Sequence, residues 1–319
     1  MKKILVCGAG GFIGTHLVRS LRAQGHYVIG ADLKFPEFST TYCNEFYQVD
    51  LRDQHSVAQL ITAGIDEIYQ LAADMGGAGY IFVGYNDADI MHNSAMINLN
   101  ILHEMVSKKI PKIFYSSSAC VYPERNQQDP QNPILSESSA YPADPDSEYG
   151  WEKLFSERLY ANYARNYGID IRVARLHNVF GPDGTYNDGR EKAPAALCRK
   201  IIECVDTIEV WGPGTQTRSF LYIDDCIEGI HRLMASTYTQ PINLGSERLI
   251  AINDLVALIS QVADRPVKIK NIPGPQGVMG RVSDNTLIHQ VLGWKPSDNL
   301  EFGLTQTYKW IEQQINAKT

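Results

Sequence analysis

A short apolar run followed by three glycines at intervals of three constrains the fold of this chain most. The run is Lys3–Cys7, the glycines are Gly8, Gly11 and Gly14, and the amphipathic stretch Thr15–Gln24 follows. This pattern predicts a strand, a tight turn and a helix whose first N–H groups are free to bind an anion. Gly8 permits the turn, Gly11 lets the backbone approach a pyrophosphate, and Gly14 allows close packing of the helix.

The next two predicted strands both end at an aspartate. His26–Ala31 leads into Asp32, which is placed to accept hydrogen bonds from an adenosine ribose and to repel a 2′-phosphate. NAD is therefore expected rather than NADP. Phe46–Val49 leads into Asp50 and Leu51, which are expected to flank the adenine. The alternative for Asp50 is that it caps the helix that follows.

Strand and helix patterns alternate through residues 1–180 and predict an NAD-binding domain of the α/β class, a doubly wound parallel sheet of the Rossmann type. Ligands of such sheets bind beyond the carboxyl ends of the strands. Leu71–Ala73, Ser116–Ser118 and Arg175–Asn178 all follow strands and are expected to line one crevice, beside a flexible, glycine-rich segment at Asp74–Tyr80. The remaining predicted elements are helices at 55–63, 89–109 and from 147, and strands at 67–71, 112–117 and 170–175.

Beyond residue 180 the predicted elements become shorter, which favours a smaller α/β lobe at 181–319 that binds a sugar nucleotide, with some crossing of the chain between lobes. Basic residues in its loops and helix starts suit a diphosphate, although each arginine taken alone is more often a solvated surface charge. The predicted elements are strands at 208–211 and 241–244 and helices at 194–205, 252–263 and 300–315.

Composition excludes several classes of protein. The 319 residues are 44% hydrophobic, which is typical of a globular chain, and no stretch is long enough to span a membrane. The apolar run after Met1 ends at Gly8, too soon for an export signal, so a cytoplasmic location is expected. The six cysteines show no C-x-x-C spacing, which argues against zinc and disulfides. A net charge of −7 without a basic run argues against nucleic acid.

Tyr149 and Lys153 lie four residues apart at the start of a predicted helix and therefore share one face. A nearby ammonium favours the phenolate, so Tyr149 is expected to exchange a proton with a sugar hydroxyl, and Ser118 is expected to share that hydrogen bond. A Tyr-x-x-x-Lys match alone is a frequent accident on solvated helices. The glycine turn and the alternating elements around it give this match its weight.

These residues resemble the extended short-chain dehydrogenase/reductase family over nearly the whole chain. The glycine turn, Tyr149-x-x-x-Lys153 and the segment Arg175–Pro182 are general to that family. Four further segments are similar to the subgroup that epimerises GDP-mannose at C3 and C5. They are 71–77, 117–123, 189–196 and 216–220.

The resemblance implies an isomerase that uses NAD and converts GDP-mannose, through a 4-keto intermediate, to GDP-L-galactose together with GDP-L-gulose, and that forms a homodimer without a metal. It implies that Cys120 and Lys192 are the acid/base pair acting on the sugar ring, and that Tyr149, with Lys153 and Ser118, serves the oxidation at C4. The expected cofactor contacts are Gly8, Gly11, Phe12, Ile13, Gly14, Asp32, Asp50, Leu51, Leu71, Tyr149 and Lys153. The expected substrate contacts are Gly77, Ala78, Ser118, Ala119, Cys120, Asn178, Glu191, Lys192, Ala193, Lys200, Gln216, Thr217, Arg218 and Arg281.

Alternatives remain open at this point. The substrate of the same acid/base set could be another GDP-sugar, such as a heptose, or the chain could be a sugar-nucleotide 4-epimerase or 4,6-dehydratase. A 4,6-dehydratase is expected to carry an acidic residue where Cys120 stands. A more distant alternative is a non-catalytic NAD-sensing module, which would have no use for Tyr149, Lys153 and Cys120 together. By itself, Cys120 is typical of a small buried core residue, and Lys192 of a surface lysine.

Overall fold

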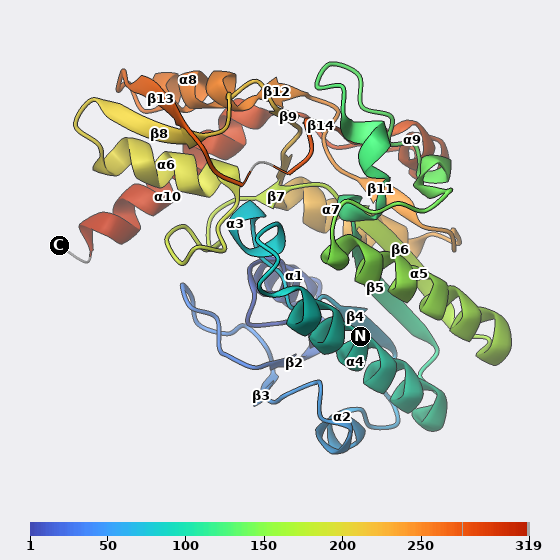
Figure 1. The fold of residues 1–319 in the computed structure, drawn as a ribbon. Helices are drawn as coiled ribbons and strands as arrows, with labels where there is room; N and C mark the ends of the chain where they lie inside the picture. The colour runs from blue at the N-terminus through green and yellow to red at the C-terminus, as the bar shows by residue number, and fades with distance from the viewer. Residues whose placement is uncertain (276, 318–319) are drawn as a thin grey trace.

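A seven-stranded sheet, in which every neighbouring pair of strands is parallel, forms the centre of the molecule (Figure 1). The computed structural model describes residues 1–275 and 277–317. The strand order is β11-β6-β5-β4-β1-β2-β3. β2 and β3 are thus added on one side of β1, and β4, β5 and β6 on the other. The predicted doubly wound Rossmann fold is confirmed. The strands are β1 (Lys3–Cys7), β2 (Tyr27–Asp32), β3 (Glu45–Gln48), β4 (Glu67–Gln70), β5 (Lys112–Ser118), β6 (Asp170–Leu176) and β11 (Ile242–Leu244).

Helices cover both faces of this sheet, as the alternation of side chains along β1 shows. Ile4 and Val6 belong to a core shared with α1 and α7, whereas Leu5 and Cys7 belong to a second core shared with α2, α4 and α5. Successive strand residues point to opposite faces, so strands buried on both sides are continuous apolar runs. The helices are α1 (Phe12–Ala23), α2 (Gln54–Leu60), α4 (Asp87–Lys108), α5 (Glu148–Tyr167) and α7 (Ile223–Ala235).

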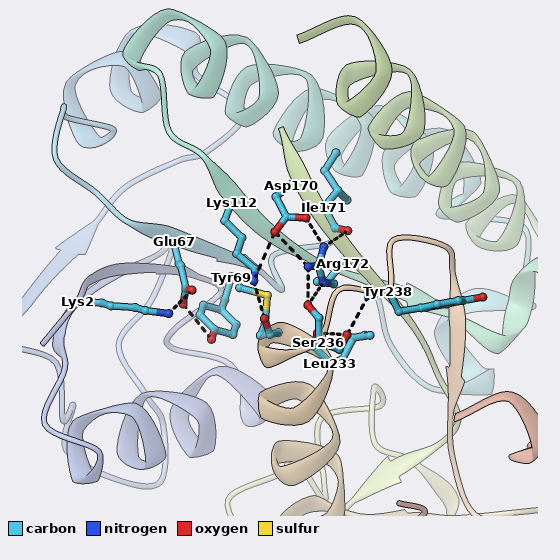
Figure 2. A network of polar contacts seen from close by, with 11 residues as sticks. Lys2, Glu67, Tyr69, Lys112, Asp170, Ile171, Arg172, Leu233, Ser236 and Tyr238 are labelled. Atoms are coloured by element: carbon cyan, nitrogen blue, oxygen red, sulfur yellow. Dashed lines mark hydrogen bonds and ion pairs between the residues drawn. The ribbon is translucent and has the colours of Figure 1, made fainter. Parts of the chain in front are cut away.

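Elements from the second half of the chain also contribute to the large sheet and to the helices that cover it. β11 pairs in parallel with β6, and α7, which was not predicted from the sequence, packs beside α1. The strand predicted at 241–244 therefore lies in the large sheet and not in the smaller lobe. Figure 2 shows how the end of α7 is held, because Lys112 Nζ donates to Met234 O at 2.6 Å and Arg172 Nε donates to Ser236 O at 3.0 Å. Cations at a helix C-terminus complement its dipole.

A smaller α/β lobe has a core of its own, to which α6, α8, α10 and β8 contribute, whereas α9 packs beside β11 on the core that includes α1 and α7. Short strands supply its edges: β8 pairs with β13, β9 lies between β12 and β14, and β7 pairs with β10. Among the described residues, no helix has the length and apolar character needed to cross a membrane. The bounds are α6 (Ala193–Glu203), α8 (Ile252–Val262), α9 (Thr286–Leu292), α10 (Leu300–Asn316), β7 (Val179–Phe180), β8 (Thr207–Trp211), β9 (Thr217–Arg218), β10 (Leu221–Tyr222), β12 (Ile250–Ala251), β13 (Lys268–Ile272) and β14 (Gly280–Arg281).

Candidate active site

The glycine turn between β1 and α1 has the geometry that a bound pyrophosphate needs. Gly8 has a φ of +85°, and a Cβ at Gly14 would lie 1.9 Å from Gly8 O. A Cβ at Gly11 would meet only Gly8 O, at 3.4 Å, among the described atoms, so this residue faces open space. No side chain caps the start of α1, and its first turn carries no acidic residue. The free N–H groups therefore suit an anion.

Around this turn, the other predicted dinucleotide contacts occupy the carboxyl ends of the strands. Asp32 ends β2, and its carboxylate accepts hydrogen bonds from Gly10 N at 3.0 Å and Lys34 N at 3.3 Å. Burial raises the pKa of Asp32, although both backbone bonds lower it. Phe12 and Ile13 are half-buried at the start of α1. These residues, together with the open face at Gly11, fit a dinucleotide.

Asp50 does not cap the helix that follows it, so that alternative is wrong. Its carboxylate binds Arg52, with Nη2 of Arg52 at 2.7 Å. Asp53 caps α2 instead, accepting from Ser56 N at 2.9 Å, because it directly precedes the first helical residue. Leu51 is buried in the core beside α2 and α4. Leu71, which follows β4, is half-buried, and its N–H donates to Cys7 O at 3.0 Å.

Ser118, Tyr149 and Lys153 meet where β5 ends and α5 begins. Ser147 caps α5 by accepting from Gly150 N at 3.2 Å, which places Tyr149 in the first turn of the helix. Tyr149 is hydrogen-bonded to Ser118. Lys153 Nζ lies 5.6 Å from the centroid of the Tyr149 ring and donates to a β5 carbonyl, Ser116 O, at 2.9 Å. The sequence spacing alone predicted that Tyr149 and Lys153 share a helix face.

The expectation that the nearby ammonium favours the phenolate of Tyr149 is wrong for the chain without a bound ligand. Burial raises the pKa of its phenol, electrostatic interactions with Cys120 and Glu152 raise it further, and the hydrogen bond from Ser118 and the charge of Arg281 offset only part of this. Burial also lowers the pKa of Lys153, against the attraction of Glu152. Sequence spacing shows that an ammonium is near but not that both groups are removed from water. In the free chain Tyr149 is therefore a neutral phenol at neutral pH.

Cys120 and Lys192 approach each other from the two halves of the chain. Cys120 is buried in a single 3₁₀ turn, Ala119–Val121, directly after β5. Lys192 directly precedes α6, and its Nζ donates to Gly76 O at 3.3 Å. Burial lowers the pKa of Lys192, while the charge of Cys120 raises it and that of Arg281 lowers it. The two predicted acid/base groups thus lie within electrostatic reach of each other.

Gly150 explains how α5 can lie against the Cys120 turn. A Cβ at Gly150 would lie only 2.1 Å from Cys120 O. The position of the turn therefore depends on a glycine in the first turn of α5. Ala119, predicted as a substrate contact, is buried in the same turn.

Arg281 is hydrogen-bonded to Cys120. It belongs to β14, and its Nη1 donates to Cys120 Sγ at 3.1 Å. Its Nε donates to Gln127 Oε1 at 2.7 Å, and its Nη2 binds Asp146. Neither Gln127 nor Asp146 was predicted as a site residue, because no local motif marks them and only β14 brings Arg281 to them.

Beside Lys192, the segment 74–80 is bound to Arg190, and we call this pair of segments the clasp. Gly77 N donates to Arg190 O at 2.8 Å. The Arg190 guanidinium lies 3.9 Å from the centroid of the Tyr80 ring and 3.5 Å from Asp74 Oδ1. The segment predicted to be flexible, Asp74–Tyr80, leads into a short helix, α3 (Ala78–Ile81). The glycine-rich segment that the sequence places beside the crevice is thus joined to backbone from the second half of the chain.

The other predicted substrate contacts surround this region, mainly on the smaller lobe. Two carry buried oxygens with no hydrogen-bond partner among the described atoms, namely Gln216 Oε1 and Glu191 Oε2. Such oxygens are costly unless a ligand or water satisfies them. Burial, and then Arg281, lowers the pKa of Arg218 to about 9. The rest bind backbone oxygens: Asn178 Nδ2 donates to Ser219 O at 3.0 Å, Lys200 Nζ to Glu209 O at 2.7 Å and Thr217 Oγ1 to Pro130 O at 2.5 Å, and Ala193 begins α6.

No group of three or more His, Cys, Asp or Glu side chains suited to a metal ion occurs in the part of the chain that the structure describes. What the site contains instead is a hydrogen-bonded Ser–Tyr pair with a nearby lysine, and a thiol within electrostatic range of a second lysine. The first set suits proton exchange with an alcohol, and the second suits proton transfer at carbon.

The sheet order, the glycine turn and the Ser118–Tyr149–Lys153 set together define a Rossmann-fold enzyme of the dehydrogenase/reductase type. More particularly, the chain belongs to the NAD dependent epimerase/dehydratase family, whose model matches residues 4–245. The family membership expected from the sequence is confirmed.

Named relatives cover almost the whole chain. It is 47% identical over 318 residues to GDP-mannose 3,5-epimerase 1 of Oryza sativa subsp. japonica, covering 99% of this chain and 83% of that protein. It is 46% identical to GDP-mannose 3,5-epimerase of Arabidopsis thaliana, covering 99% and 84%. Among solved structures, UDP-glucuronic acid 4-epimerase from Bacillus cereus in complex with UDP-glucuronic acid and NAD matches with a TM-score of 0.83 and 26% identity, covering 98% of this chain and 99% of that one.

Proposed function

We propose that this chain epimerises GDP-mannose at C3 and C5 through a 4-keto intermediate, yielding GDP-L-galactose together with GDP-L-gulose. The observation that carries the proposal is that Cys120 and Lys192, from opposite halves of the chain, are close enough to interact electrostatically, as Cys120 and Tyr149 also are. Relatives named GDP-mannose 3,5-epimerase, 46–47% identical over nearly the whole chain, support this choice of substrate.

The chemistry needs an oxidation step because hydrogens on C3 and C5 of a hexose are too weakly acidic for a protein base to remove. NAD, when bound, supplies the oxidation of C4 and its later reduction. The glycine turn and Asp32 would hold it, for the reasons of fit given above. As a phenolate, a state that bound NAD⁺ and the ammonium of Lys153 would favour over the neutral phenol of the free chain, Tyr149 accepts the proton of the C4 hydroxyl and later returns it, while Ser118 shares its hydrogen bond.

Inversion of a carbon next to the ketone needs two proton-transfer groups. We assign Cys120, as thiolate, to remove the proton from one face of the ring, and Lys192, as ammonium, to donate from the other. Burial lowers the pKa of Lys192, which makes its ammonium a readier proton donor than a solvated lysine. A simple 4-epimerase needs neither group, since it changes only C4.

The proposed nucleotide-sugar site lies between the clasp and strand β9 of the smaller lobe, with Gln216 just before that strand. Gln216 and Glu191 offer the buried, unsatisfied oxygens described above, and Arg218 offers a half-buried cation for a diphosphate. The homodimer and the cytoplasmic location expected from the sequence remain predictions. Exposed apolar side chains on the paired helices, Leu99 of α4 and Trp151 and Phe155 of α5, support an interface there.

The test is incubation of the purified enzyme with GDP-mannose in D₂O, followed by NMR of the products. We expect deuterium at both C3 and C5, which neither a 4-epimerase nor a 4,6-dehydratase would place at both carbons. Cys120→Ala is expected to retain NAD and still reduce it, but to lose ring-proton exchange. Tyr149→Phe is expected to lose cofactor reduction as well, because it lacks the proton acceptor.

Two results would contradict this proposal. Exchange at the wild-type rate in Cys120→Ala would remove Cys120 from the acid/base pair. Inversion that continues at full rate after complete removal of the dinucleotide would remove the 4-keto intermediate, and with it the whole mechanism.

A further inference from the structure

Arg281 is a buried cation, and each of its three guanidinium nitrogens binds a protein group. Its exposed fraction is 6%, and its three nitrogens bind Gln127, Cys120 and Asp146. The Asp146 side chain is 1% exposed. Contacts on three sides hold the charge in one place, with one N–H aimed at the sulfur at 3.1 Å.

An arginine in this position acts only as a fixed charge. The guanidinium does not lose its proton at any relevant pH, so Arg281 can neither remove nor donate a ring proton. An N–H of a cation directed at sulfur stabilises a thiolate more than a thiol, and the effect is larger away from water.

We propose that Arg281 is a positioning residue that holds Cys120 as a thiolate oriented for proton abstraction, and that Asp146 orients Arg281 and moderates its charge. The other charged or titratable groups that interact with Cys120 are Lys153, Lys192, Arg218 and Tyr149. Within the described residues, the three cations add to the positive field but do not donate to the sulfur as Arg281 does, and the neutral phenol of Tyr149 adds no charge. The role of the thiolate in epimerisation rests on the proposed function, whereas its stabilisation by Arg281 does not.

The proton balance of the step is complete without any further reactant. An S–H bond forms as the C–H bond next to the ketone breaks, and the electron pair passes into the carbonyl as an enolate. An N–H bond of Lys192 then breaks as a new C–H bond forms on the other face of the ring. Exchange with water returns the thiolate and the ammonium. Arg281 keeps its proton throughout.

Arg281→Met and Asp146→Asn are expected to change the rate of Cys120 alkylation in opposite directions. A general disturbance of the structure would not produce opposite changes. The probe is iodoacetamide at about pH 7.5, which only the thiolate attacks, forming an S–C bond and releasing iodide. Alkylation of the Cys120 peptide, followed by mass spectrometry, should slow by about tenfold in Arg281→Met because the fixed charge is gone. It should become faster than wild type in Asp146→Asn, which keeps the size of the side chain but removes the opposing charge. Arg281→Lys should recover part of the rate.

Controls exclude loss of folding or of access. Methionine is shorter than arginine, so slower alkylation in Arg281→Met cannot come from a newly blocked thiol. The half-buried Cys43 and Cys204 are internal references in the same digest, and Cys120→Ala gives the blank. Circular dichroism and NAD binding check the fold. If Arg281→Met does not fold, the Lys and Asn variants still decide the question.

The proposal is overturned if Arg281→Met alkylates at the wild-type rate, or if Arg281→Met and Asp146→Asn shift the rate in the same direction. A wild-type enzyme that shows no ring-proton exchange with GDP-mannose would overturn the proposed function and leave the alkylation result to decide the role of Arg281. The two failures are therefore distinguishable.

Discussion

His177 shows at the scale of one residue how burial decides chemistry. It follows β6 in a segment whose sequence was expected to point into the crevice, yet its side chain is 0% exposed. Its Nε2 pairs with Asn243 Oδ1 at 3.1 Å, and its Nδ1 has no partner among the described atoms. Burial lowers the pKa of His177 from 6.5 to about 3, and the charges of Arg281 and Arg175 add to this effect.

This histidine should make the fold sensitive to acid. The folded chain keeps His177 neutral down to about pH 3, whereas the unfolded chain takes up the proton below about pH 6.5. Stability is therefore lost as pH falls from 6.5 toward 3, by about 1.4 kcal/mol per pH unit. Urea unfolding at pH 7 and pH 5 should show a loss roughly 2 kcal/mol smaller in His177→Gln than in wild type. Equal losses in the two proteins would contradict this assignment.

At the scale of elements, the β1–α1 turn was predictable because its constraints are local. A strand, a positive φ at Gly8 and a helix start follow one another within a few residues. α7 was missed, although its apolar residues recur at helical spacing. Its middle residue, Gly229, would place a Cβ 2.4 Å from Leu244 Cδ1, so this glycine serves close packing against β11. A glycine within a helical pattern weakens a sequence-based prediction of the helix.

The glycine turn offers a matched pair of substitutions. Gly11→Ala should leave the urea midpoint near that of wild type, because its φ of −83° suits alanine and the added Cβ meets only Gly8 O at 3.4 Å. It should weaken NAD binding by about tenfold or more, since the methyl group occupies the open face. Gly14→Ala should instead lose about 1–3 kcal/mol of stability, because its Cβ would lie 1.9 Å from Gly8 O. Urea unfolding curves measure the stability of the two variants, and NAD titrations monitored by fluorescence measure their affinity for NAD. Unchanged NAD affinity in Gly11→Ala would place the pyrophosphate elsewhere.

At the scale of the whole molecule, the proposed site exists only where the two halves of the chain meet. Lys192 and Arg281 come from beyond residue 180, whereas Cys120, Tyr149 and Lys153 come from before it. Other residues of the two halves are in contact as well. Phe38 of the first half packs edge-on against Trp310, with ring centroids 5.1 Å apart.

The clasp beside Lys192 predicts a split between the two chemical steps. Arg190→Met removes the ion pair with Asp74 and the contact with Tyr80, so Lys192 should be held less firmly. Deuterium exchange into the sugar should fall by about tenfold. Reduction of the cofactor, which depends on Tyr149, should change little.

Arg232→Met is the matched control. Arg232 is similarly exposed, at 43% against 45% for Arg190, and also has one ion pair and one aromatic contact, but it lies on α7. It should leave both steps unchanged. Equal loss of both steps in Arg190→Met would show that the clasp serves folding alone.

The sequence by itself determined the plan of the parallel sheet, the glycine turn and the shared face of Tyr149 and Lys153, because these depend on residues a few positions apart. Only the tertiary structure decided that β11 joins β6, that Arg281 binds Cys120, and that burial raises the pKa of Tyr149 where a depressed pKa was expected. Charge and desolvation at a side chain are set by its neighbours in space. In this fold, those neighbours come from distant segments of the chain.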